Sequence, residues 1–224
     1  MLLTGERTGY RNDTDRELRF RQESNFFWLT GCDIPASSAA LVYQPQSPST
    51  SASHTTHLFI PEEDPLEVLW SPAPPNLQQA RELFDATHVV FTKDFTNKLR
   101  TVLEENPSHC IHTLPSSPQF PAHSKEIQRI ATETRYLLTA IHQARLTKDE
   151  YEISLIRKAN HISSRAHEVV MRLLGQGVKD KTIYTNGTGG AAKNKSALLM
   201  PSEWRITKEA EAEAVFVATC RREG

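Results

Sequence analysis

Cysteine is scarce in this chain of 224 residues, and its few cysteines lie far apart. Cys32, Cys110 and Cys220 form neither a CxxC pair nor an even set that would suggest a disulfide framework. Disulfides persist in oxidising compartments, whereas thiols stay reduced in the cytosol. The pattern therefore predicts three reduced thiols in a cytoplasmic protein.

The chain also lacks long apolar runs and a large net charge of either sign. No run approaches the roughly 20 apolar residues that span a bilayer, and the first residues (MLLTGER) lack the regions of a signal peptide. The formal net charge of -1 provides no attraction to nucleic acid or to an anionic membrane surface. With 38% hydrophobic and 24% charged residues, the composition is that of a soluble globular protein. We expect it to bind neither nucleic acid nor a membrane.

Short apolar segments alternate with helical patterns in the first half of the chain. A run of apolar residues bounded by turn formers is typical of a strand, whereas spacing by three and four residues is typical of a helix. This alternation predicts a mixed α/β sheet with crossover connections. The expected strands are 26–30, 39–44, 56–60, 89–91 and 110–114, the expected helices are 76–84 and 93–105, and 45–53 is expected to be a surface loop.

Residues 19–31 (RFRQESNFFWLTG) stand out because a charged lead-in runs into four large apolar residues. Aromatic side chains fill a pleated surface well, and the run is short for a helix, so we expect a strand buried on both faces. Two interpretations of the flanking Arg19, Arg21, Gln22 and Asn25 remain open. They form either a solvated entrance to the strand or a polar constellation at a domain or subunit junction.

The second half of the chain has a helical pattern. A Pro/Ser-rich connector at 115–124 is followed by an expected helix over 126–144. Thr147 and Glu150 fit a capping box, after which apolar residues recur at helical spacing from Ile153 to Leu173. Gly175 is the expected end of this helix.

A second segment of special composition, 177–201, is rich in Gly, Lys, Asn and Thr and predicts a flexible insertion. A last helix is expected after Thr207, which would cap it.

These signals divide the chain into three parts. The first domain covers 1–115, a connector with a helix covers 116–146, and a linker helix with the start of a further domain covers 147–224.

Several partial motifs are present, but each lacks a group that its chemistry needs. The Gly-rich piece 187–193 has Ala192 where a phosphate-binding loop needs its last glycine. His167 begins an HExxH-like stretch in which Met171 replaces the second zinc ligand. His54 and His57 would need further ligands, and Glu209, Glu211 and Glu213 fan around a helix. We therefore assign no catalytic, cofactor-binding or metal-binding residue.

The blocks at 20–33, 58–71 and 148–159 together resemble those of the Xaa-Pro aminopeptidase and prolidase family, and of its fungal members most closely. In the family these blocks have the forms FRQ-x-x-x-F-x-Y-L-[ST]-G, LF-[IV]-P-x-x-D-P-x-x-x-x-W and K-x-x-x-E-[IL]-x-x-[IL]-[RK]-x-A. The corresponding segments here are 20–33, 58–71 and 148–159, with weaker likeness at 162–167 and 207–224.

The resemblance implies a creatinase-like N-terminal domain followed by helices of an incomplete pita-bread (α+β) catalytic domain. Members of the family cleave the bond before a proline at position two of a peptide. They use two Mn²⁺ ions held by two Asp, one His and two Glu, and the resemblance also implies a homodimer. The Asp-Ala-Gly block and the later His and Glu blocks are not found in residues 1–224. A non-catalytic module for oligomerisation or partner binding is the alternative function.

Overall fold

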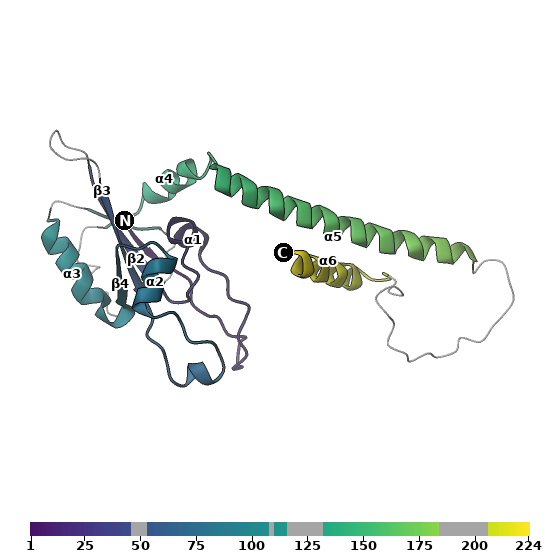
Figure 1. Ribbon diagram of the computed structural model, residues 1–224, viewed down its shortest axis with the longest axis horizontal. Coiled ribbons are helices and arrows are strands. Elements are labelled where there is room, and N and C mark those ends of the chain that lie inside the picture. Colours follow the sequence, from purple (N-terminus) through teal and green to yellow (C-terminus); the bar gives the residue numbers. More distant parts are fainter. Residues whose placement is uncertain (46–52, 108–109, 116–131, 184–205) are drawn as a thin grey trace. The chain divides into compact units, whose positions relative to one another are not determined.

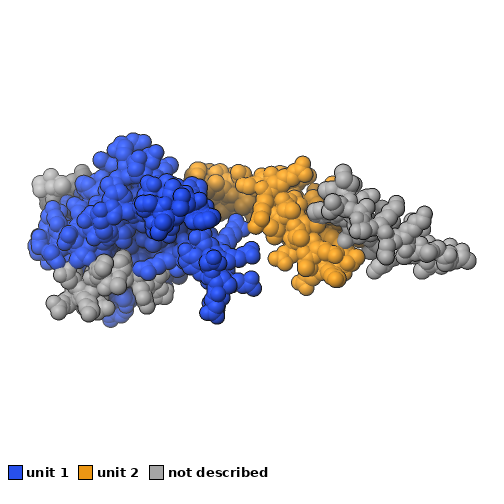
Figure 2. Space-filling model, turned by 90° about the horizontal axis from the view of Figure 1, so that it is seen from below, with its two compact units in different colours: residues 1–146 blue, residues 147–224 orange. Residues whose placement is uncertain are grey.

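The computed structural model describes residues 1–45, 53–107, 110–115, 132–183 and 206–224, and for 176–183 only the backbone. The chain divides into two units, Met1–Leu146 and Thr147–Gly224, which Figure 2 distinguishes by colour. No helix among the described residues is long and apolar enough to cross a membrane.

A four-stranded mixed sheet forms the centre of the first unit (Figure 1). Its strands are ordered β1-β2-β3-β4, with bounds Leu2–Thr4, Ser38–Gln44, Ser53–Ile60 and His88–Phe91. The first two pairings are antiparallel, and β3 pairs with β4 in parallel. The parallel pair is connected through a helix, as a crossover requires, so the predicted mixed sheet is confirmed.

Helices cover both faces of this sheet. On one face, α1 (Ser24–Thr30), α2 (Leu77–Leu83) and α4 (Leu137–Ala144) enclose a core that includes Phe26, Ala80 and Ile141. On the other face, α3 (Phe95–Glu105) packs Phe95 against Phe59 of β3. Short 3-10 turns at Glu67–Leu69 and Thr92–Asp94 precede α2 and α3. The predicted helices 76–84 and 93–105 are therefore confirmed within one or two residues.

The predicted strand at 26–30 is wrong, because this segment forms helix α1. Its exposure pattern is helical, since Phe26 and Thr30 are buried one turn apart whereas Phe27 is 48% exposed. The Glu23 carboxylate caps the first turn by accepting the Phe26 N–H at 2.6 Å. Gly31, at φ 65°, ends the helix in the left-handed conformation. These two local caps outweigh the preference of aromatic residues for strands.

The predictions around the connector need correction as well. Residues 132–133 form strand β6 (Thr132–Glu133), which pairs in parallel with β5 (Ile111–His112) in a separate small sheet. Of the predicted helix 126–144, the structure describes residues 132–144, and the helical part of these is α4, from Leu137 to Ala144. Residues 46–52 of the predicted loop and 116–131 lie outside the described residues, and Ser53 already belongs to β3.

The second unit is a pair of packed helices, α5 (Glu150–Ile183) and α6 (Glu209–Glu223). The capping residue of α5 is Asp149 and not the predicted Thr147, because Asp149 Oδ1 accepts the Glu152 N–H and Glu152 Oε2 accepts the Asp149 N–H. The helix continues through Gly175. Of the predicted flexible insertion, 177–183 is helical, and 184–201 falls outside the described residues.

The start of α6 also differs by one position from the prediction. Lys208, and not Thr207, is the residue that precedes the first helical residue. Thr207 donates its hydroxyl to Glu211 Oε2 at 3.0 Å, and the same oxygen accepts the Thr207 and Lys208 N–H groups. Because these hydrogen bonds favour the ionised carboxylate, they lower the pKa of Glu211. Glu211 is thus a structural group at a helix start.

His57 makes the stability of the first unit depend on pH. It lies on β3 opposite His88 of β4, and their rings stack at 4.8 Å. Burial, and then the nearby His88 and Lys98, lower the pKa of His57 from 6.5 to about 4. Between these values the unfolded chain binds a proton that the folded chain does not. The free energy of unfolding therefore falls as the pH decreases through this window.

We predict that His57→Gln removes a pH-dependent loss of stability of up to about 3 kcal/mol. Urea unfolding at about pH 7 and about pH 4.5 would measure it. His54→Gln is the matched control, because His54 is an exposed histidine of the same strand. An unchanged pH slope in His57→Gln, or an equal change in His54→Gln, would contradict this assignment.

Candidate functional site

Gln22 lies at the centre of the polar residues that flank α1. Its Oε1 accepts the N–H groups of Glu6 at 2.6 Å and Glu23 at 3.0 Å, and its Nε2 donates to the Ile34 carbonyl at 3.0 Å. One side chain thus joins three backbone segments. A Cβ atom placed on Gly5 would lie 2.7 Å from Gln22 Oε1, so the absence of a side chain at Gly5 allows this close approach.

Asn25 connects α1 to the end of α4. The Asn25 side chain is buried, and its Oδ1 accepts a hydrogen bond from Arg145 Nη1 at 2.8 Å. Asn25 Nδ2 donates to the Glu23 carboxylate, and the Arg145 guanidinium lies 5.9 Å from the Trp28 ring centre. Gln22 and Asn25 do form a polar constellation, but it lies inside the first unit, so no domain or subunit junction is shown there. Arg19 and Arg21 are exposed, as a solvated lead-in would be. Arg145 carries no motif in the sequence, so only the fold reveals its role.

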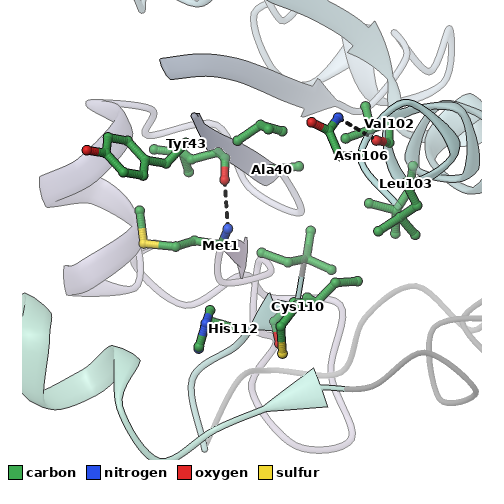
Figure 3. Close-up of a pocket in the computed structure, with 13 residues that line it drawn as sticks. Met1, Ala40, Tyr43, Val102, Leu103, Asn106, Cys110 and His112 are labelled. Atoms are coloured by element: carbon green, nitrogen blue, oxygen red, sulfur yellow. Dashed lines mark hydrogen bonds between the residues drawn. The ribbon is translucent and has the colours of Figure 1, made fainter. Parts of the chain in front are cut away.

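An apolar cavity of about 470 Å³ lies at the α3 face of the sheet (Figure 3). The Met1 amino group at its wall donates to the Leu41 carbonyl at 2.6 Å. Burial lowers the pKa of this amino group, and the Cys110 thiol acts in the opposite direction. Asn106 also lines the cavity but donates to the Val102 carbonyl at the end of α3. The cavity can therefore accommodate an apolar group.

Where the structure describes them, the partial motifs of the sequence do not converge on one site. His57 and His54 lie on β3, where His57 is paired with His88 and His54 is exposed. His167 packs on Phe216 across the two helices of the second unit, at 4.8 Å between ring centres. The Gly-rich piece 187–193 lies outside the described residues. Within those residues, no group of three or more His, Cys, Asp or Glu is arranged to hold a metal ion.

The loop between β3 and α2 carries exposed apolar side chains. Leu66 and Leu69 are each 72% exposed and Trp70 is 88% exposed. Asp64 Oδ1 accepts the Leu66 N–H at 2.8 Å, which shapes the turn before the short 3-10 helix. Such exposure of neighbouring apolar side chains is typical of an interaction surface.

A family comparison agrees with this fold. The sequence model of the aminopeptidase P N-terminal domain matches residues 1–112. The chain therefore belongs to the aminopeptidase P family and contains the N-terminal domain that is typical of its members.

Curated relatives match along nearly the whole chain. The probable Xaa-Pro aminopeptidase pepP of Pyrenophora teres f. teres is 34% identical over 220 residues, which are 98% of this chain and 39% of the relative. The corresponding protein of Aspergillus niger is 32% identical over 224 residues, 100% of this chain and 40% of the relative. The chain thus spans about two fifths of the length of these relatives.

Solved structures show the same fold. Proline aminopeptidase P II from Yersinia pestis aligns with a TM-score of 0.66 at 18% identity, covering 100% of this chain and 45% of that one. Aminopeptidase P from Escherichia coli aligns with a TM-score of 0.61 at 19% identity, covering 76% of this chain and 40% of that one. The predicted fold class and the family resemblance are therefore confirmed.

We predict that Gln22→Ala destabilises the first unit by about 1 to 3 kcal/mol, because it removes the side-chain partner of three backbone groups. Gln22→Glu keeps the acceptor but loses the donor to the Ile34 carbonyl, so it should cost stability as well. Urea unfolding measures both changes. Gln143→Ala, at an exposed position of α4, is the control and should change stability by less than about 0.5 kcal/mol. Equal effects of Gln22→Ala and Gln143→Ala would disprove the structural role of Gln22.

We further predict an energetic coupling between Asn25 and Arg145 of about 1 to 2 kcal/mol in a double-mutant cycle of Asn25→Ala and Arg145→Ala. The cycle removes the separate effects of each truncation, including the loss of the Asn25 hydrogen bond to Glu23. Arg145→Lys keeps the positive charge without the planar guanidinium and should retain less than half of the coupling. Strictly additive single changes would contradict this prediction.

Proposed function

We propose that this chain is the non-catalytic N-terminal part of an Xaa-Pro aminopeptidase, a hydrolase that removes an N-terminal residue preceding proline. The main support is the family match over residues 1–112, extended by 34% identity over 220 residues to an Xaa-Pro aminopeptidase. In this proposal residues 1–115 form the creatinase-like domain, 116–146 the connector, and 147–224 the linker helix and the first part of a pita-bread domain.

The residues described here do not fit the two Mn²⁺ ions that the family implies. The described parts of the chain contain no group of three or more His, Cys, Asp or Glu that could hold a metal ion. In this proposal the described residues contribute no metal ligand and no catalytic residue. The relatives extend over more than twice the length of this chain.

The proposed contribution of this chain is architectural. A sheet covered by helices on both faces carries an exposed loop with Leu66, Leu69 and Trp70. In the whole enzyme, this part of the chain would border the entrance for peptides with proline at position two. It would also take part in a homodimer in the cytoplasm.

The alternative is a non-catalytic module that acts in oligomerisation or partner binding. In this alternative another protein would cover helix α5, because several of its large apolar side chains are exposed in the second unit. Leu155 is 48%, Ile156 is 45% and Met171 is 63% exposed. An apolar face of this length needs a covering surface, which either a peptidase domain or another protein would supply.

A chimera tests the two functions. Residues 1–224 replace the matching segment of the Pyrenophora teres pepP protein, and release of the first residue from an Ala-Pro peptide is measured with and without Mn²⁺. We expect Mn²⁺-dependent release by the chimera and by unmodified pepP, and none by residues 1–224 alone.

Two results would contradict the proposal. Mn²⁺-dependent cleavage by residues 1–224 alone would show that this chain is itself catalytic. A folded chimera that binds Mn²⁺ without cleaving the peptide, together with stable oligomers of residues 1–224 in light scattering, would favour the non-catalytic module instead.

A further inference from the structure

A concavity of about 310 Å³ at the β4 edge of the main sheet is lined by three cationic or basic side chains. Arg81 comes from α2, His88 from β4 and Lys98 from α3, so three separate elements contribute to it. Gln78 and Thr87 add further polar groups. The remaining lining residues are Leu77, Val89 and Val90, so none of the lining residues is acidic.

The fold explains why these side chains meet. Helices α2 and α3 pack on opposite faces of the sheet, and β4 is the last strand in the order of the described sheet. Side chains from both helices therefore reach the same edge. The concavity therefore combines Arg81 of α2, His88 of β4 and Lys98 of α3.

The buried neighbour of the concavity reports its electrostatic character. His57 is 4% exposed and stacks directly on His88. Its Nδ1 is buried without a hydrogen-bond partner. Burial is the main cause that lowers the pKa of His57, and the nearby His88 and Lys98 act in the same direction. Arg81 and Lys98 are cationic and no acidic residue lines the concavity, and a positive potential in a concave site attracts anions.

One lining residue, Gln78, hydrogen-bonds to the carboxylate of Glu82. Glu82 Oε1 accepts a hydrogen bond from Gln78 Nε2 at 2.6 Å, but Glu82 does not line the concavity. Lys93, which is also close in sequence, is paired with Glu62 outside the concavity. Arg81 and Lys98 have no such carboxylate among the residues that line the concavity with them.

From this arrangement we propose that the concavity between α2, β4 and α3 binds a small, multiply charged oxyanion of the phosphate type. An arginine fork, an ammonium group and an imidazole are donors that suit such oxyanions. A singly charged carboxylate would leave part of this positive charge uncompensated. The volume of about 310 Å³ accommodates a diphosphate group.

Binding of inorganic pyrophosphate to the 224-residue chain tests this site. Isothermal titration at constant ionic strength is expected to show saturable binding, and acetate at the same ionic strength is expected to show none. Arg81→Gln and Lys98→Gln should each weaken the affinity by about 5-fold or more, because each removes one charge but keeps most of the aliphatic stem. Arg100→Gln is the matched control, since Arg100 belongs to α3 but does not line the concavity.

Absence of saturable binding, or equal weakening by Arg100→Gln, would overturn the proposal. A second readout does not depend on whether the variants fold. In the unmodified chain, the ring resonances of His88 and His57 should shift with the same saturation curve as the calorimetric signal. If those resonances stay unchanged while pyrophosphate binds, the anion is bound elsewhere and the proposed site is wrong.

Discussion

Strand β3 is the element on which the rest of the first unit depends. Leu58 and Ile60 belong to the core on one face of the sheet, whereas Phe59 belongs to the core on the other face. All three side chains are essentially fully buried. Because successive side chains of a strand point to opposite faces, these three neighbouring residues anchor both helical layers. Complete burial of one such side chain contributes about 1.5 to 3 kcal/mol.

The motif residues near α1 have a structural role that depends on this sheet. Gln22 satisfies backbone groups of three segments, and Asn25 joins α1 to Arg145. Buried polar groups are costly when they lack partners, so these side chains fix the loops around the core. The residues that made the family recognisable therefore hold the domain together. In the part of the chain that the structure describes, they form no reactive centre.

The two units differ in how completely their apolar surfaces are covered. The first unit has apolar cores on both sides of its sheet. In the second unit, Ala166 and Val215 are buried between α5 and α6 while large apolar residues of α5 remain exposed. A family whose members are more than twice as long supplies an explanation, since the remaining residues of a relative could cover such a helix.

The sequence by itself determined the sheet strands at β2, β3 and β4, the helices α2 and α3, and the family, because apolar periodicity and motif spacing are local properties. The sequence predicted a strand at 26–30 because the segment is rich in aromatic residues. In the structure this segment belongs to helix α1, which is capped by Glu23 and ended by Gly31. Only the tertiary structure brought Asn25 to Arg145, and Arg81 to Lys98. Those pairs come from elements that are far apart in sequence or on opposite faces of the sheet, and packing alone makes them neighbours.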